Sequence, residues 1–325
     1  MQNDYGMEEF MTQFEIFTDS AANIPDALIQ ERGIRVIPYI CNIDGKEYSC
    51  IQENVPFEQT AKTFYEKMRA GAEIKTSLIG QQRIADAFTP YLQEGKDIVM
   101  VTIASGISGT YAQALNARDD LLKEFPDRKI YIVDGANASL GEGLIVLRIA
   151  DLRDMNESIE ECYEWAQNNA YKVNSYFTVD DLKYLRKGGR ISKTLALAGS
   201  ILNIKPILKA DGGTPAKMAF FSKTRGRKKA LSALLEYFDA QVVRPDQQTV
   251  AIAHADCEED ANELSAALKE RGVRDVIVEY YDLCTGTHVG PGTIALFFFG
   301  KDRRNPSATA EPALSHGTVP NPKGI

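Results

Sequence analysis

Short apolar segments and amphipathic segments alternate along the first half of the chain. Runs of β-branched and apolar residues predict strands, and apolar residues repeated at three- and four-residue spacing predict helices. The predicted strands are 14–18, 98–103 and 129–133, the predicted helices are 57–70, 81–93, 140–153 and 157–171, and a hairpin at 36–48 turns at Asp44-Gly45. Such alternation is typical of a mostly parallel sheet that helices cover on both faces.

The second half of the chain has more strands and a second turn signal at Asp211-Gly212-Gly213. The predicted strands are 176–179, 205–209, 216–222, 249–254, 276–282 and 293–299, and the predicted helices are 180–187, an apolar segment 194–202 capped by Ser192, a segment ending near Phe238, and 258–271. We therefore expect a second α/β unit with a mixed sheet.

These patterns predict an α/β protein of two domains. Residues 1–12 show no period and are expected to be a flexible N-terminus. Residues 13–172 form the N-terminal α/β unit and residues 173–300 the C-terminal one. From Lys301 the composition shifts to Arg, Asn, Pro, Ser and Thr, which predicts a disordered tail over 301–325.

The stretch 98–117 is the first candidate for binding chemistry. It is expected to form a strand, a Ser- and Gly-rich loop over 104–109, and a helix. The amide groups of a first helical turn lack internal partners, and the helix dipole favours negative charge there. A carboxylate or phosphate is therefore the expected guest of the hydroxyl groups in this loop, including Ser108.

Other polar side chains stand next to predicted strands and helices of the first unit. Asp19 and Ser20 follow the first strand, at the edge where ligands gather in open α/β sheets. Thr76 and Ser77 precede the helix 81–93, so they are candidates either for a ligand loop or simply for capping that helix.

Composition narrows the functional classes. The chain has 325 residues, is 44% hydrophobic and has a formal charge of −8, which disfavours nucleic acid as a general partner. The five cysteines form no Cys-x-x-Cys pair and no secretory segment is recognised, so we expect reduced thiols and a cytoplasmic location. No apolar run is long enough to cross a bilayer, although transient contact with a membrane surface stays compatible with the sequence.

Few catalytic motifs are present. Gly-x-Ser-x-Gly, Gly-x-Gly-x-x-Gly and the P-loop are absent at strand-to-helix turns, and three histidines without a cysteine pair give no basis for a metal site. We predict no catalytic residue, no cofactor and no metal. A serine hydrolase in which Asp19, Ser108 and His288 converge remains the alternative, because triads are recognised by geometry.

Several single residues allow an ordinary structural interpretation. Trp165 is assigned to core packing, His288 in a Gly-Pro-Gly loop to a surface or structural position, and Arg190 to the end of a helix. The basic segment 225–229 is either a solvated face or a docking surface for an acidic partner.

Seven segments taken together resemble the DegV family, whose members include bacterial fatty-acid-binding proteins. They are, in chain order, 14–20 (FEIFTDS), 75–77 (KTS), 108–111 (SGTY), 133–134 (VD), 181–191 (DLKYLRKGGRI), 202–208 (LNIKPIL) and 288–292 (HVGPG). The ordered set spans residues 14–300. One departure is the segment 76–80 (TSLIG), which lacks the proline and second serine that are frequent in the family.

The resemblance implies a two-domain α/β protein with a long-chain fatty acid between the domains. Thr76 and Ser108 would hold the carboxylate, and Arg190 and His288 would lie near the head group or face a kinase. The family implies presentation of the acid to a separate fatty-acid kinase, which makes an acyl phosphate for lipid synthesis, with no phosphoryl transfer by the carrier. A lipid-responsive regulatory binding module is a further alternative.

The lipid tail needs apolar walls. The sequence candidates, most of which are expected to be ordinary core residues, are Ile201, Ile204, Ile207, Met218, Phe220, Phe221, Ile294 and Phe298.

Overall fold

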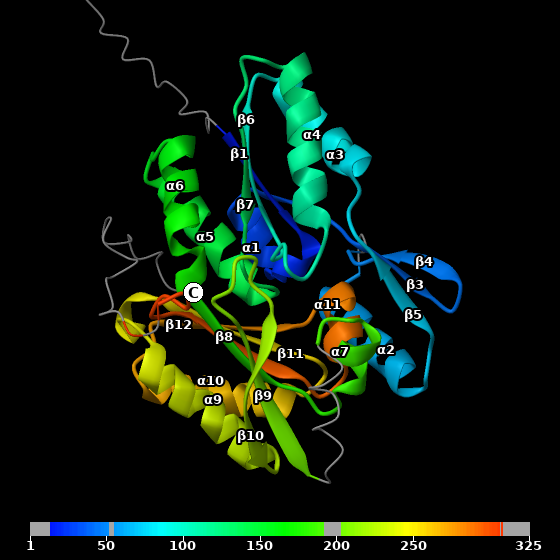
Figure 1. Cartoon of the computed structure of the whole chain (residues 1–325), viewed down its shortest axis with the longest axis vertical. Coiled ribbons are helices and arrows are strands. Elements are labelled where there is room, and N and C mark those ends of the chain that lie inside the picture. The colour runs from blue at the N-terminus through cyan, green and yellow to red at the C-terminus, as the bar shows by residue number, and fades with distance from the viewer. Residues whose placement is uncertain (1–13, 52–54, 192–202, 306, 308–325) are drawn as a thin grey trace, which may run out of the picture.

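The computed structural model describes residues 14–51, 55–191, 203–305 and 307 (Figure 1). The elements are β1 (Phe14–Asp19), η1 (Ser20–Ala22), α1 (Asp26–Glu31), β2 (Ile34–Ile37), β3 (Ile40–Ile43), β4 (Lys46–Ser49), α2 (Phe57–Arg69), β5 (Ile74–Ser77), α3 (Gln81–Gln93), β6 (Asp97–Thr102), α4 (Thr110–Glu124), β7 (Ile130–Asp134), α5 (Leu140–Asp154), α6 (Ile159–Asn169), η2 (Ala170–Lys172), β8 (Val173–Thr178), α7 (Lys183–Lys187), β9 (Ile204–Ala210), β10 (Met218–Arg225), α9 (Arg227–Gln241), η4 (Pro245–Gln247), β11 (Thr249–His254), α10 (Glu258–Glu270), β12 (Asp275–Tyr280), α11 (Leu283–Val289) and β13 (Ile294–Phe299).

The first lobe is built on a four-stranded parallel sheet of order β2-β1-β6-β7. The buried apolar runs of β1 and β6 fit strands covered on both faces. Helices α3 and α4 pack together on one side of this sheet, and α5 and α6 lie on the other (Figure 1). The predicted doubly covered parallel sheet is confirmed, and its loops after β1, β6 and β7 meet at one edge.

A small antiparallel sheet of order β4-β3-β5 projects from the first lobe (Figure 1). Asp44 and Gly45, both with positive φ, make the turn between β3 and β4, as the sequence predicts. The prediction of one strand over 36–43 is wrong, because Val36 and Ile37 pair with β1 whereas Ile40–Ile43 enters the small sheet. Pro38 lies between the two strands and offers no backbone donor for a continuous ladder.

The second lobe is built on a six-stranded mixed sheet of order β10-β9-β8-β13-β11-β12. Among the described strands of this sheet, β11 and β12 pair in parallel and the other neighbours pair antiparallel, so the predicted mixed sheet is confirmed. Side chains alternate between its two faces. One face, with Phe177 and Phe297, joins the core of the first lobe, and the other, with Tyr176 and Phe298, packs under α9 and α10.

Three of the predicted segments lie partly or wholly outside the described residues. The predicted helix 194–202 and the flexible N-terminus 1–12 lie outside them. Residues 301–305, which the composition assigns to the tail, pack on the fold, because the backbone of Arg303 donates to Tyr171 and its guanidinium donates to Asp211 and Ala136.

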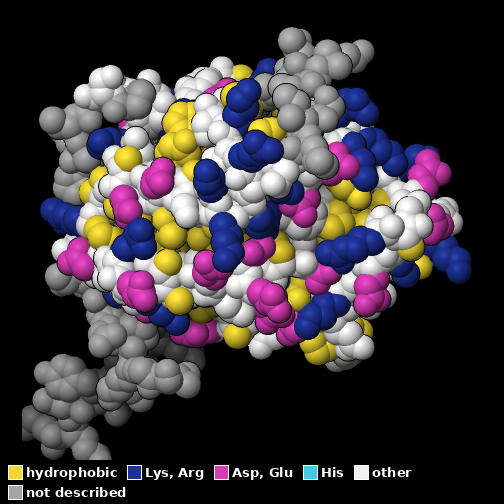
Figure 2. Space-filling model, turned by 90° about the horizontal axis from the view of Figure 1, so that it is seen from below, with side chains coloured by type: hydrophobic (Ala, Val, Ile, Leu, Met, Phe, Trp, Pro, Cys, Tyr) yellow, Lys and Arg dark blue, Asp and Glu magenta, His cyan; other side chains and the backbone are white. Residues whose placement is uncertain are grey.

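Charges are interspersed on the surface. Figure 2 shows acidic side chains among the Lys and Arg side chains on the face that it draws, and neither sign of charge covers a large area of that face. Arg227, from the basic segment 225–229, is bound to Asp260 at 2.7 Å and lies 3.5 Å from Asp180. This arginine is therefore part of the fold's own ion pairs and is not a free docking cation.

Candidate functional site: a cavity between the lobes

A cavity of about 320 Å³ lies where the loops after β6 and β7 face the second sheet. Its polar lining includes Tyr39, Thr76, Ser108, Arg190, Thr285 and His288, and its apolar lining includes Ile103, Ile107, Phe177, Met218, Val289 and Phe297. All four residues that the sequence singles out as binding candidates, Thr76, Ser108, Arg190 and His288, thus line one cavity. The sequence separates Thr76 from His288 by more than 200 positions, and the fold brings them together.

Ser108 is positioned by a loop that is fixed at both ends. Asp134, at the end of β7, accepts hydrogen bonds from the backbone and the hydroxyl group of Ser105. The amide of Ser108 donates to the carbonyl of Ala104 at 3.1 Å, which tightens the loop before α4. A methyl group on Gly106 would lie 2.2 Å from the carbonyl oxygen of Ala216, so only glycine allows the loop to approach the β9–β10 hairpin this closely.

Thr76 lies near the end of β5, paired with Cys41 of β3, and its Oγ1 is 2.9 Å from Nε2 of His288. The interpretation of Thr76 and Ser77 as caps of α3 is wrong, because Gly80 is the N-cap residue of that helix. The interpretation of His288 as a residue of a rigid loop is also wrong. His288 lies in the last turn of α11, and Asp282 caps the start of this helix.

His288 is neutral in the folded protein at neutral pH. Burial lowers its pKa to about 4, and the positive charge of Arg190 adds to this effect. Gly188, which follows α7, lies against the imidazole ring, since a methyl group there would be 2.3 Å from Nδ1. Arg190 is the one Lys or Arg among the described residues that line the cavity. The site therefore combines neutral hydrogen-bonding groups with one fixed positive charge.

Tyr39 is a site residue that the sequence analysis misses. Its hydroxyl group lies 2.7 Å from Oγ1 of Thr110, and Thr110 Oγ1 lies 3.1 Å from Oγ of Ser108. The hydroxyl of Tyr39 also faces Asp19 at 3.5 Å. Residue 39 stands between two short strands, so no motif marks it, and Thr285 is missed because the helix that carries it is not predicted.

Three of the eight tail-wall candidates are core residues, fewer than expected. Met218 lines the cavity. Ile207, Ile294 and Phe298 face the opposite side of the second sheet and pack in the core under α9 and α10. Phe220 and Phe221 are 37% and 39% exposed, Ile204 is half-buried, and Ile201 lies outside the described residues. Residues of β8 and β13 on the other face, Phe177 and Phe297, form the apolar wall instead.

The hydrolase alternative requires a hydrogen bond between Asp19 and His288 and a second one between His288 and Ser108. Within the described residues, Nε2 of His288 is bonded to Thr76, and Asp19 accepts from the amides of Ala21 and Ile103. Ser108 is bonded to Thr110. These three residues therefore do not form a hydrogen-bonded triad.

No group of three or more His, Cys, Asp or Glu side chains among the described residues is arranged to hold a metal ion. None of the helices that the structure describes has the length and apolar character to cross a membrane.

The fold and the cavity define a class: a two-lobed α/β protein with a pocket between the lobes that is polar at one part and apolar at the other. The chain belongs to the DegV family, because the family model described as "Uncharacterised protein, DegV family" matches residues 13–301. A DegV domain-containing protein of Clostridium perfringens is 41% identical over 297 residues, which cover 91% of this chain and 100% of that protein. The predicted family is thus confirmed.

Solved structures agree with this assignment. A DegV family protein from Thermus thermophilus, described by its fatty-acid binding, has a TM-score of 0.76 at 26% identity and covers 89% of this chain and 100% of that chain. A DegV lipid-binding protein from Thermotoga maritima has a TM-score of 0.77 at 28% identity, covering 90% and 99%. DegV of Bacillus subtilis, a fatty-acid-binding protein, has a TM-score of 0.74 at 28% identity, covering 89% and 99%.

Proposed function

We propose that this protein is a non-catalytic carrier of a long-chain fatty acid, with the carboxylate held by Thr76 and Ser108. The observation that carries the proposal is that a hydroxyl group from strand β5 and one from the loop before α4 line one cavity whose remaining walls include Phe177, Met218 and Phe297. The fatty-acid binding described for the solved relatives supports the same ligand class.

The cavity suits both ends of such a ligand. Each buried CH₂ group contributes about 0.8 kcal/mol, so the tail supplies most of the affinity, less the entropy of ordering the chain. The hydroxyl groups of Thr76 and Ser108 would replace the water that the carboxylate loses, and Arg190 would balance its charge. Neutral His288, bonded to Thr76, would orient that hydroxyl group.

The first prediction concerns retention of lipid. The double variant Thr76→Ala/Ser108→Ala should lose most of the co-purifying fatty acid, because two donors to the carboxylate are removed while the tail walls stay. Native mass spectrometry of freshly purified protein measures bound lipid. The control is Thr89→Ala/Ser232→Ala, which removes two helix-surface hydroxyl groups that bond only to carbonyls four residues earlier. Equal lipid in the double variant and the control would refute the proposal.

We also propose that the carrier presents its ligand to a fatty-acid kinase, with Arg190 and His288 near the carboxylate head group that receives the phosphoryl group of ATP. A lysate of the source organism, supplied with ATP and loaded carrier, should form acyl phosphate that hydroxylamine traps as a hydroxamate. Formation should depend on wild-type protein and fail with Thr76→Ala/Ser108→Ala. Bound lipid without hydroxamate would favour the regulatory binding module. The use of ATP fits the expected cytoplasmic location. We also propose that the carrier takes up its fatty acid during transient contact with a membrane surface.

A further inference from the structure

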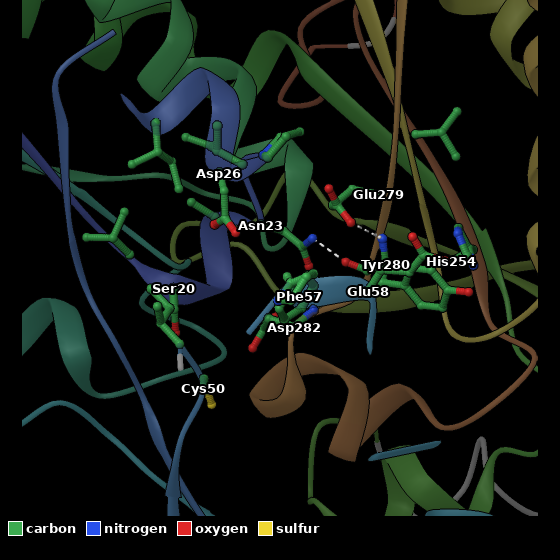
Figure 3. Close-up of a pocket in the computed structure, with 18 of the residues that line it drawn as sticks. Ser20, Asn23, Asp26, Cys50, Phe57, Glu58, His254, Glu279, Tyr280 and Asp282 are labelled. Carbon is green, nitrogen blue, oxygen red and sulfur yellow. Dashed lines mark hydrogen bonds between the residues drawn. The ribbon is translucent and has the colours of Figure 1, made fainter. Parts of the chain in front are cut away.

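A second cavity, of about 440 Å³, has Asp19 and Asp282 in its lining, neither of which lines the first cavity. We call it the acidic cleft. Residues from both lobes line it: η1 and α1 from the first, the start of α2, and the ends of β11 and β12 with the start of α10 from the second. Figure 3 shows side chains of these segments turned toward a common space, among them Asn23, Glu58, His254 and Glu279.

Carboxylates dominate the charge of the acidic cleft. The six that line it are Asp19, Asp26, Glu58, Glu258, Glu279 and Asp282, and the described lining residues include no Lys or Arg. Lys62 stands nearby, 2.5 Å from Glu58 and 4.0 Å from Glu258, and so balances part of the charge at the rim. Within the described residues, no ion pair is formed by the other four carboxylates. The cleft thus carries an excess of negative charge.

Asp282 supplies an independent sign of a missing partner. The residue is 3% exposed, and its Oδ1 accepts from the amides of Cys284 and Thr285 at 2.8 and 3.0 Å. Its Oδ2 is buried and has no hydrogen-bond partner among the described residues. A buried acceptor without a donor costs about 1–3 kcal/mol, more when it is charged. Asp282 lines the cleft, and Oδ1 alone accepts from the start of α11, so this arrangement leaves Oδ2 without a donor.

The electrostatics of the lining agree with this geometry. Burial raises the pKa of Asp19 and of Glu279 to about 7 and that of Asp282 to about 6. Neighbouring negative charges also contribute, Asp282 for Asp19 and Asp26 and Glu58 for Glu279. A positive group bound in the cleft would lower these pKa values again, because it favours the ionised carboxylates.

We propose that the acidic cleft binds a small aliphatic cation carrying ammonium or guanidinium groups. The acceptors are spread over the cleft and alternate with Ile24, Pro25, Phe57 and Val278, which suits an extended alkyl amine and not a compact ion. The alkyl part packs on these side chains, and the cationic ends bind Glu279 and Asp282. An ammonium group at this end of the cleft would supply the donor that Oδ2 lacks.

Isothermal titration calorimetry of the whole protein tests the proposal at fixed ionic strength. Spermidine and cadaverine should bind saturably, whereas 1,5-pentanediol, the neutral analogue of cadaverine, should not. The amide-blocked amino acid N-acetyl-lysine methylamide distinguishes a side chain of another polypeptide from a free amine. Binding of the blocked lysine without binding of the free amines, equal binding of the diol, or no saturable binding would each overturn the proposal.

Two matched double variants locate the site. Glu58→Gln/Glu279→Gln should weaken amine binding by roughly tenfold or more, which corresponds to about 1.4 kcal/mol. Glu263→Gln/Glu270→Gln removes the same charge from exposed positions of α10 outside the cleft and should leave affinity within about twofold. Equal losses in both would mean diffuse attraction and would refute the site. Thr76→Ala/Ser108→Ala should bind amine normally, so failure of the carrier proposal stays distinguishable.

Discussion

At the scale of single residues, Tyr39 connects the two cavities. It lines the cavity between the lobes, and its hydroxyl group lies between Asp19 of the acidic cleft and Thr110, which in turn bonds Ser108. The position of the proposed carboxylate-binding hydroxyl therefore depends on a side chain that has no motif. Thr76 and Ser108 could be selected from sequence because each stands in a short segment shared with a family, whereas Tyr39 reaches the site only through the fold.

Removing the hydroxyl group of Tyr39 tests this connection. Tyr39→Phe should lower the free energy of unfolding by about 1 kcal/mol, because Thr110 loses a buried partner, and should reduce bound fatty acid by freeing Ser108. Urea unfolding and native mass spectrometry measure the two effects. Tyr237→Phe is the control, since its hydroxyl group bonds Ser222 away from both cavities. The connection is refuted if both variants retain the same lipid.

The carboxyl group of Glu279 should make the free energy of unfolding depend on pH. Burial raises its pKa to about 7, so the folded state favours the neutral carboxyl and loses stability as the pH rises from about 4.5 to about 7. Glu279→Gln removes this loss, and Gln keeps an acceptor for the amide of Tyr280. The variant should therefore exceed wild type in free energy of unfolding at about pH 8, with the difference shrinking toward pH 4. A difference that does not change with pH would contradict the prediction.

At the scale of elements, periodic segments were predictable and short ones were not. Helix 81–93 and the strands 249–254 and 294–299 follow long apolar patterns, and the structure has them at or near the predicted bounds. Helix α11 has seven residues, with two threonines and a glycine in place of an apolar period. Its one local signal is Asp282, a favourable N-cap residue, and only packing under α7 and β5 makes the segment helical.

The contact between α7 and α11 positions His288 and can be disturbed from the α7 side. Gly188→Ala places a methyl group 2.3 Å from Nδ1 of His288, so the ring must shift and its hydrogen bond with Thr76 is disturbed. We expect a loss of about 1–3 kcal/mol in the free energy of unfolding together with reduced lipid retention. Gly80→Ala adds a methyl group that meets no atom within 4 Å and should retain its lipid. Normal retention by Gly188→Ala would show that the position of His288 does not matter.

At the scale of the whole molecule, alternation of strands and helices predicts two α/β units, yet it does not predict the cavity between them. The cavity depends on which face of the second sheet meets the first lobe. Phe297 and Phe298 are adjacent and equally apolar, but alternation along β13 directs the first to the cavity and the second to the core under α9. A one-residue change in the register of β13 would exchange them, and the sequence offers no local signal for that choice.

Arg303 holds the lobes together beside this cavity. Its guanidinium donates to the carbonyl of Asp211, in the β9–β10 hairpin, at 2.5 Å and to the carbonyl of Ala136, in the loop after β7, at 2.7 Å. The ring of Tyr171 lies 5.2 Å from the guanidinium carbon. Residues 137–139 of the same loop line the cavity, so movement of the hairpin away from Ala136 would open its wall.

Arg303→Ala should therefore release bound lipid several-fold faster than wild type and lower the free energy of unfolding by about 1–3 kcal/mol, because the part-buried carbonyls of Asp211 and Ala136 lose their donor. Transfer of a fluorescent fatty acid from the protein to vesicles measures the rate. Arg304→Ala is the matched control, since the side chain of Arg304 is exposed and bonds Asp302 without joining the lobes. If the two variants release lipid at the same rate, the link between the hairpin and the β7–α5 loop does not control the cavity.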